Sequence, residues 1–386
     1  MKFVLILLFI LFPAVLTGQV IPSETEPEGG FSTDPRVGSY YQVFPLAGYT
    51  SDWGLFGGGF IQRINYGVHV FPFLSNAKAD VIFSTNGTLL SSAEYERIRT
   101  FGSSIRSRIE FIGERQLRGH YFGIGNETVY SDERYEDGFF YYENREIYIS
   151  YQARRKVGEF GNRGMLDSFL KTSFSNVNGV VRGEESLFEE EQPGGFGENR
   201  VLKVGIGLVA DSRDSEFMPT RGLRYQAGFN TTVPVFSNDF SYSDLSLEMR
   251  HFFHLFGNVV LAHKFEAEHI IGDAPFWDYA VIGTQLGLRG YHLHRFRGNS
   301  SLLNIVELRT WLFSMFDEKI RFGAQAFWDS GRVFSNLDNS SVFSDWNHTY
   351  GVGGALSLFN PDFFVRGDVG FSNETYRVYF GAGYIF

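Results

Sequence analysis

Apolar and polar residues alternate over most of this chain, in segments of about ten residues that are separated by short polar turns. In "YRVYFGAGYIF" at the C-terminus, every second residue is apolar or aromatic: Tyr376, Val378, Phe380, Ala382, Tyr384 and Phe386. In "KIRFGAQAFWDSG", Ile320 and Trp328 would share an apolar face, and Arg321, Gln325 and Asp329 would share the other. A period of two residues predicts β-strands with one apolar and one polar face.

Counting back from the C-terminus, the same alternation recurs often enough to define a complete set of strands. We predict sixteen, near residues 39–50, 53–64, 78–86, 88–100, 104–116, 139–154, 164–177, 200–210, 221–235, 240–254, 257–270, 302–314, 319–331, 348–359, 362–371 and 376–386. Alternating strands also build soluble sandwiches. Here the strands are too many and too aromatic for that, so we predict an all-β fold, a transmembrane antiparallel barrel of 16 strands.

The lengths of the connections predict which end of the barrel faces out. Single-chain bacterial barrels keep both termini in the periplasm and alternate short inner turns with longer outer loops. The segments 117–138, 178–199, 271–301 and 332–347 are long and fall on the outer side. Two connections break the rule: the tight turn at Asn86-Gly87 on the outer side, and the long inner link 65–77. The register of the first three strands is therefore the least determined.

The N-terminus predicts export. Residues 1–18 combine a lysine, an apolar run and a small residue, as a secretory signal peptide does. Residues 19–38 are polar and contain proline and glycine, so we expect a flexible periplasmic lead before a barrel at 39–386. The chain has no cysteine, which excludes disulfides and a cysteine-linked lipid anchor. A net charge of −10 argues against nucleic acid as a partner.

The sequence offers little catalytic chemistry. His292 and His294, and likewise His251 and His254, have no third ligand at metal spacing, so we read them as ordinary loop and strand residues. No nucleophile elbow or phosphate-binding loop is present in the sequence. We expect no cofactor and no enzymatic activity. The acidic stretch "GEESLFEEE" falls in an outer loop and fits a solvated tip, or a bridge to divalent ions or lipopolysaccharide.

Three motifs follow one another in the second half of the chain. "LRGYHLHRFRGN" with "NIVELR" supplies Arg289, Gly290, Tyr291, Gly298, Glu307 and Arg309. "FWDSGRVF" supplies Phe327, Asp329 and Gly331, and "VADSRDSEFMPTRG" supplies Asp211, Arg213, Asp214, Pro219 and Gly222. In order and spacing they resemble signatures of the BamA/TamA superfamily of outer-membrane proteins, the bacterial surface antigen family.

The resemblance implies that the outer loop 271–301 folds back into the barrel lumen. Arg289 would then pair with Glu307 and Asp329, which alternation places on the inner wall of adjacent strands. Gly290 would permit a positive-φ turn and Tyr291 would pack on the wall. Gly331 belongs to the same set of residues that hold the loop against the wall. We expect the Asp211–Gly222 segment to form an inner turn in which Asp211, Arg213 and Asp214 bond one another, with Pro219 and Gly222 setting the bend.

The resemblance also implies a function in the outer membrane of a Gram-negative bacterium. Relatives insert proteins into that membrane or pass polypeptides through it, without enzymatic chemistry. The seam between first and last strands would open, and its free edge would template a client strand, with Tyr384 and Phe386 at the seam and C-terminal signal. Expected partners are outer-membrane lipid and lipopolysaccharide and client outer-membrane or surface proteins.

One feature departs from the family pattern. Typical members carry periplasmic POTRA domains before the barrel, and the lead leaves no room for one, so we expect a member lacking POTRA domains. A periplasmic or POTRA-bearing partner protein would then supply that function. Two alternatives remain open: an accessory or structural barrel subunit of an outer-membrane complex without transport activity, and a barrel enzyme or small-solute channel.

Overall fold

The computed structural model describes residues 37–386, except 69, 71–72, 162–163, 182–184, 217, 235–239, 285–286, 317–319, 336–340 and 359–363. The expected signal peptide at 1–18 and nearly all of the lead at 19–38 lie outside the described residues. None of the described helices is long and apolar enough to cross a membrane.

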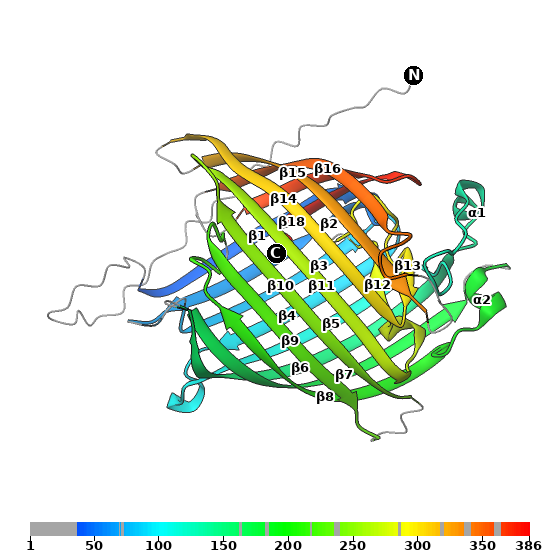
Figure 1. Cartoon of the computed structure of the whole chain (residues 1–386), viewed down its shortest axis with the longest axis horizontal. Coiled ribbons are helices and arrows are strands. Elements are labelled where there is room, and N and C mark those ends of the chain that lie inside the picture. The colour runs from blue at the N-terminus through cyan, green and yellow to red at the C-terminus, as the bar shows by residue number, and fades with distance from the viewer. Residues whose placement is uncertain are drawn as a thin grey trace, which may run out of the picture.

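Sixteen antiparallel strands form one sheet that curls into a barrel, which confirms the predicted fold class (Figure 1). Between β1 and β18, which end the sheet, each strand pairs with the strands before and after it in the sheet, and β11 pairs with β14 across an inserted segment. The strands are β1 (Gly38–Thr50), β2 (Gly54–Tyr66), β3 (Ser75–Ser84), β4 (Thr88–Arg97), β5 (Ile105–His120), β6 (Tyr141–Phe160), β7 (Gly164–Val181), β8 (Gly197–Asp211), β9 (Gly222–Thr232), β10 (Ser241–His254), β11 (Val259–Asp273), β14 (Ser300–Met315), β15 (Ile320–Phe334), β16 (Asn347–Leu358), β17 (Phe364–Phe371) and β18 (Tyr376–Ala382).

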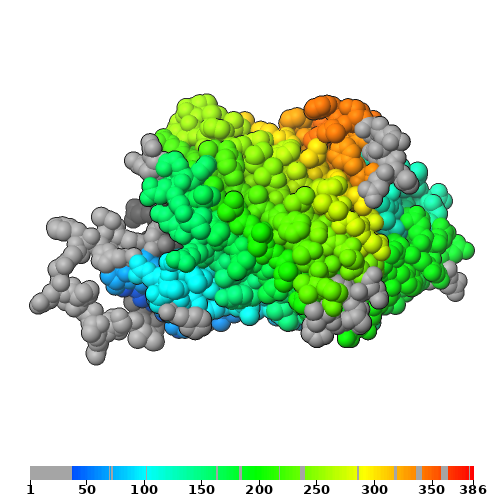
Figure 2. Space-filling view, turned by 60° about the horizontal axis from the view of Figure 1, so that its bottom comes forward, coloured from blue at the N-terminus to red at the C-terminus, as the bar shows by residue number. Residues whose placement is uncertain are grey.

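The two faces of the strands differ as the alternation predicts. On β15, Trp328 is 47% exposed whereas the next residue, Asp329, is fully buried. On β14, Leu308 is 46% exposed and Glu307 is 1% exposed. On these two strands the exposed apolar side chains thus face the outside of the barrel, and the buried acidic side chains face its interior. The residues of the middle strands, green to yellow in Figure 2, form a continuous outer wall.

Four short elements lie in the loops and have no counterpart among the predicted strands. They are α1 (Asp132–Glu136), α2 (Leu187–Glu191), β12 (Ala280–Ile282) and β13 (Phe296–Gly298), and the last two pair with each other. Two 3-10 turns, η1 (Thr100–Gly102) and η2 (Phe276–Asp278), complete the set. Elements of three to five residues are too short to produce a recognisable period. All but η1 gather at one end of the barrel (Figure 1), the outer end of the predicted orientation.

The outer loops pack against one another through aromatic side chains. Phe188 of α2 and Phe276 of η2 are 0% and 1% exposed and form a cluster with Tyr121 and Tyr142. Burial of such rings stabilises the loops, because each removes a large apolar surface from water. The described parts of these outer loops therefore pack together as a cover at this mouth of the barrel.

The link between β2 and β3 at the inner end is longer than a tight turn because it packs an aromatic side chain against the barrel. It spans residues 67–74 and buries Phe73, which is 2% exposed and lies 5.4 Å beneath the guanidinium of Arg106. The outer turn at 85–87 is tight, as the sequence indicates, and Gly87 adopts a φ of +83°. The turn at 51–53 between β1 and β2 is equally short.

Candidate functional site

Arg289 lies at the centre of the candidate site, against the inner wall formed by β14 and β15. Its Nε and Nη2 donate to the two carboxylate oxygens of Asp329 at 2.9 and 2.8 Å, and its backbone N–H donates to Asp329 at 3.0 Å. Its Nη1 lies 2.7 Å from Glu307, and its guanidinium carbon lies 3.3 Å above the centre of the Phe327 ring. All polar edges of the guanidinium therefore face acceptors, as bidentate recognition requires.

Two further arginines extend this contact into a buried ion cluster. Arg309 bonds the second oxygen of Glu307 at 2.8 Å, and Arg366 pairs with Asp368, which lies 3.7 Å from Arg289. Three guanidinium groups thus oppose three carboxylates, all on residues at most 7% exposed. Because the charges balance, the cluster can be buried without a net ion. Removing one member would leave an unpaired buried charge, at a cost of about 3–5 kcal/mol.

Gly290 lets the loop backbone touch the wall directly. Its φ is +110°, and a Cβ at this position would lie 2.8 Å from the carbonyl carbon of Phe371. Gly370 is its counterpart on β17, since a Cβ there would lie 2.8 Å from the carbonyl carbon of Arg289. Both the conformation and the contact distance therefore demand glycine. The Gly290 N–H then donates to the Tyr379 hydroxyl at 2.9 Å.

The neighbouring motif residues pack around this contact. Tyr291 is 2% exposed, and its hydroxyl donates to Asn373 at 2.5 Å. A Cβ at Gly331 would lie 3.1 Å from the Ile282 side chain, so the glycine leaves room for β12 against β15. Burial lowers the pKa of His292 well below its usual range, and its Nε2 lies 2.8 Å from the Tyr130 hydroxyl oxygen.

The same loop is bonded to the two ends of the sheet. The Leu293 N–H donates to the Asp52 carboxylate at 3.3 Å, and Asp52 pairs with Arg377 of β18. Asp52 belongs to the turn between β1 and β2. One carboxylate therefore joins the first hairpin, the last strand and the loop at the outer rim.

The edges of the sheet meet over a short distance. β1 and β18 are the two terminal strands of the sheet order, and within the described residues no ladder joins them. Their backbones connect at Ser51, whose N–H donates to Val378 O at 3.0 Å and whose hydroxyl accepts from Val378 N–H at 2.9 Å. The barrel is thus nearly closed, with its seam fastened at the outer end.

The end of the chain differs from the prediction. The last strand was expected to run to residue 386 with Tyr384 and Phe386 facing outward, but β18 ends at Ala382. Gly383 takes a φ of +75° and turns the chain away from the sheet. Phe386 is then 5% exposed beside Phe252, and its carbonyl accepts from Arg309 Nη1 at 3.2 Å. The tail therefore packs against the inner ion cluster, because its aromatic rings and carbonyl find partners there.

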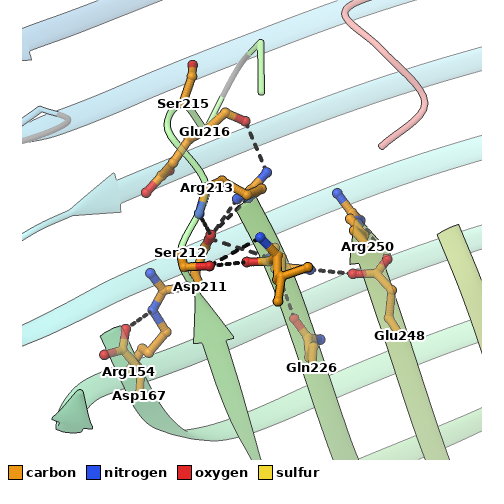
Figure 3. Close-up of polar contacts among 12 residues, drawn as sticks. Arg154, Asp167, Asp211, Ser212, Arg213, Ser215, Glu216, Gln226, Glu248 and Arg250 are labelled. Carbon is orange, nitrogen blue, oxygen red and sulfur yellow. Dashed lines mark hydrogen bonds and ion pairs between the residues drawn. The ribbon is translucent and has the colours of Figure 1, made fainter. Parts of the chain in front are cut away.

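The third motif forms the connection between β8 and β9, at the end of the barrel opposite the outer loops. Figure 3 shows its polar contacts. Arg213 Nη2 lies 2.7 Å from Asp211, and Asp214 accepts the N–H groups of Thr220 and Arg221 at 2.8 and 3.2 Å. A Cβ at Gly222 would lie 2.4 Å from the carbonyl oxygen of Ser212, and Pro219 is buried. We call residues 212–221 the inner strap.

The inner strap reaches opposite walls of the barrel. Glu216 accepts two hydrogen bonds from Arg106 of β5, at 2.9 and 3.1 Å, and Met218 Sδ lies 4.0 Å from Arg321 of β15. β5 and β15 are eight places apart in the sixteen-strand order, so the strap crosses the inner mouth. A cavity of about 740 Å³ lies behind it, lined by strap residues, Trp311, His254 and Tyr384.

Within the described residues no group of His, Asp and Glu side chains could hold a metal ion.

Comparisons with known proteins agree with this geometry. The Omp85 superfamily domain matches residues 91–386, which is most of the chain. The chain belongs to the Omp85 superfamily. No curated protein matches it significantly.

Solved structures show the same fold as this Omp85 barrel. BamA from Haemophilus ducreyi lacking POTRA domains 1–3 superimposes with a TM-score of 0.58 at 13% identity, covering 90% of this chain and 70% of that chain. CdiB from Acinetobacter baumannii gives 0.55 at 11% identity, and CdiB from Escherichia coli gives 0.57 at 11% identity. This chain spans 59% and 62% of those two CdiB chains, and 89% of this chain is covered in each case.

Several residues of the Omp85 site were not selected from the sequence. Arg366 and Asp368 lie two residues apart in "FVRGDVGF", and alternation would have placed both on the inner wall. Asp52 and Arg377 carry no local signal, because they are 325 residues apart and meet only when the barrel curls. Glu216 was within a quoted motif, but its partner Arg106 lies 110 residues away.

Proposed function

We propose that this Omp85 barrel assists the insertion or translocation of polypeptides at the outer membrane of a Gram-negative bacterium, without enzymatic chemistry. Client polypeptides and outer-membrane lipids, including lipopolysaccharide, would be its partners. Its proposed action is to offer the backbone edge of β1 to an incoming strand, which gains hydrogen bonds as in other β-augmentation. The resemblance in the loop and turn motifs supports this assignment.

The seam is the observation that carries the proposal. Ser51 and Asp52 fasten β1 to β18 at the outer rim, through Val378 and Arg377. The rest of β1 has no ladder partner among the described residues on that side. An unpaired edge normally invites pairing by another chain, so a barrel that keeps one is suited to receive a strand.

The loop would set how readily this seam opens. Leu293 and Arg377 share the Asp52 carboxylate, and Gly290 bonds Tyr379 on the last strand. Opening at the rim would therefore have to break contacts of the loop as well as those of the strands. We propose that Arg289, Glu307, Asp329 and Asp368 hold the loop in the position where it makes these contacts.

A disulfide across the seam tests the proposal. The chain has no cysteine, so Ser51→Cys with Val378→Cys would form the only possible bond. In cells depleted of the native protein, we expect the oxidised double variant to fail to restore the outer-membrane and surface protein inventory, as measured by quantitative mass spectrometry. Reductant should restore it.

A matched disulfide controls for the chemistry. Thr231 and Ser243 are direct partners on β9 and β10, and their hydroxyl oxygens are 2.9 Å apart. A bond between cysteines at these positions joins strands that are already paired, so full activity is expected. Full activity of the oxidised seam variant would refute opening at the seam. If depletion alone lowers no client protein, the chain is instead an accessory or structural subunit, or a channel.

A further inference from the structure

Two arginines face each other on the outer surface of the barrel. Arg115 of β5 and Arg145 of β6 are direct cross-strand partners in the ladder. Their side chains are 50% and 53% exposed. Like charges directly opposite on adjacent strands are destabilising, so this pairing calls for a compensating anion.

The chain supplies one carboxylate for the two arginines, which leaves one positive charge without a counterion. One oxygen of Glu143 accepts from Arg115 Nε at 3.0 Å and from Arg145 Nε at 2.8 Å. A single carboxylate therefore orients both guanidinium groups and neutralises one of them. The Glu143 side chain is 14% exposed, whereas both arginines keep about half of their surface open. The trio carries one net positive charge with free N–H groups directed outward.

A third guanidinium adds to this charge. Arg118 is exposed and its guanidinium carbon lies 5.7 Å from the centre of the Tyr141 ring, near the outer ends of the same two strands. A bulge between Gln116 and Gly119 shifts the register here and gives the segment an extra residue. We name Arg115, Arg118, Arg145 and Glu143 the rim cluster, which has a net charge of +2.

The rim cluster sits directly beyond the apolar outer surface of the same strands. Along β5, the outward side chains run from Ile109 and Phe111, which are 48% and 39% exposed, through Gly113 to Arg115. Along β6, they run from Ile149 and Ile147, which are 42% and 47% exposed, to Arg145. A molecule lying along these two strands would contact apolar side chains over most of its length. Its outer end would meet the guanidinium groups.

We propose that the rim cluster binds the phosphorylated headgroup of a lipid in the outer leaflet, with the lipid's acyl chains on the rows below it. A phosphate has several negatively charged oxygens and the geometry to accept paired N–H groups from more than one guanidinium. It would supply the second anion that the facing arginines lack. Basic side chains at a membrane rim attract anionic lipid in this way. The site is separate from the seam, but its lipid ligand rests on the outer-membrane placement in the proposed function.

Lipid retention by the purified full-length protein tests the site. The protein is reconstituted in phosphatidylcholine vesicles that contain a small fraction of bisphosphorylated lipid A, and lipid that stays bound after gentle detergent extraction is quantified by mass spectrometry. Each basic side chain near an anionic surface contributes roughly fivefold to affinity, so Arg115→Ala with Arg145→Ala should bind lipid A about 25-fold more weakly. Arg155→Ala removes an exposed arginine from the other end of β6 and should have no effect.

Three results would overturn the assignment. The first is equal retention of lipid A by the double variant and the native protein, provided that both show the same heat-shifted mobility of a folded barrel. The second is equal retention of dephosphorylated lipid A with the same acyl chains, which would mean that the apolar rows alone bind. The third is displacement of lipid A by excess inorganic phosphate, which would mark a site for free phosphate. Selective loss in the double variant, confined to phosphorylated lipid, supports the proposal.

Discussion

At the scale of single residues, the site depends on how closely two backbones approach. The loop backbone at Gly290 and the β17 backbone at Gly370 lie so close that a side chain on either residue would overlap the other segment. This contact places Arg289 beside its carboxylate partners. Arg289 also touches Glu307 and Asp368, so its position is defined by three acids and not by one ion pair. Exchanging Arg289 with Asp329 would keep the total charge of the cluster but would place a new carboxylate beside Glu307 and Asp368, where like charges repel.

Gly290→Ala should displace the loop. The added Cβ would lie 2.8 Å from the Phe371 backbone at a φ of +110°, and both the contact and the strained conformation are unfavourable. We expect a loss of about 3 kcal/mol in local stability and new protease cleavage within residues 287–299. Limited proteolysis with mapping of the fragments measures both the rate and the position of cutting.

Gly102→Ala separates conformation from contact. Gly102 of η1 has a φ of +74°, but a Cβ there would meet nothing within 4 Å, so only the backbone strain is introduced, away from the loop. It should cost about 1 kcal/mol and leave the cleavage pattern of residues 287–299 unchanged. Equal cleavage in the two variants would show that the contact with β17 does not position the loop.

At the scale of elements, each mouth of the barrel is covered by a connection that is too long or too polar to be a simple turn. The outer cover uses aromatic packing of α2 and η2, whereas the inner strap uses an ion pair to β5 and a contact of the Met218 sulfur with Arg321 of β15. The difference follows from composition, since the strap contains Asp214, Glu216 and Arg213 within four residues. Ion pairs at a mouth open more readily than packed rings, because water can replace their hydrogen bonds.

Glu216→Gln should release one end of the inner strap. The side chains of Glu216 and Arg106 are 25% and 15% exposed, and the neutral amide would lose the charge-assisted part of their two hydrogen bonds. We expect a loss of about 2 kcal/mol locally. Hydrogen–deuterium exchange of residues 212–221 should become faster. Glu159→Gln, which removes the partner of Lys156 in a highly exposed pair, should leave that exchange unchanged.

Acid should release the native strap in the same way. Burial acts to raise the pKa of Glu216, but hydrogen bonds and charge from Arg106 hold it below its usual range. A carboxylate with a depressed pKa contributes stability that is present above its ordinary pKa of about 4.3, and that is lost as the pH falls through the folded value. The protection of residues 212–221, corrected for the slower intrinsic exchange in acid, should thus fall only in acid, with a smaller step in Glu216→Gln. An identical step in both would assign the effect to another group, such as Asp214.

At the scale of the whole molecule, the two covers lie in series along the barrel axis. The loop that carries Arg289 also supplies η2 to the outer aromatic cover, and the strap with its cavity of about 740 Å³ lies at the inner mouth. The chain's C-terminal tail packs between them, on Arg309. Solute flow through the lumen would have to pass both covers, whereas a strand added at the seam would pass neither. This arrangement is consistent with the proposed addition of a strand at the edge of the sheet.

Conductance across planar bilayers should therefore respond to the two covers together. Replacing residues 284–295 with two glycines should raise single-channel conductance only slightly, because the inner strap remains. Adding Glu216→Gln to that barrel should raise it more than the two separate increases combined. Adding Glu159→Gln instead is the matched control and should change nothing. A native barrel with a large steady conductance would contradict this picture and favour a channel.

The sequence by itself determined the sixteen strands and their two faces, because a period of two is a local property that the chain displays along every strand. It also selected Arg289, Gly290, Glu307 and Asp329, which lie in recognisable motifs on predicted inner positions. The sequence defined the ends of a strand less well where the strand continues in polar residues beyond its alternating apolar positions, as β6 does. The register of the first strands followed only from the ladders.

Only the tertiary structure decided which distant residues meet. The Asp52–Arg377 pair exists because the sheet curls until its ends touch, and the Glu216–Arg106 pair because a strap crosses the lumen. The inward turn after Ala382 reflects contacts of Phe386 with Phe252 and Arg309, which outweigh the local preference of "YRVYFGAGYIF" for a longer strand. Such contacts depend on closure of the barrel, and no local pattern of residues records it.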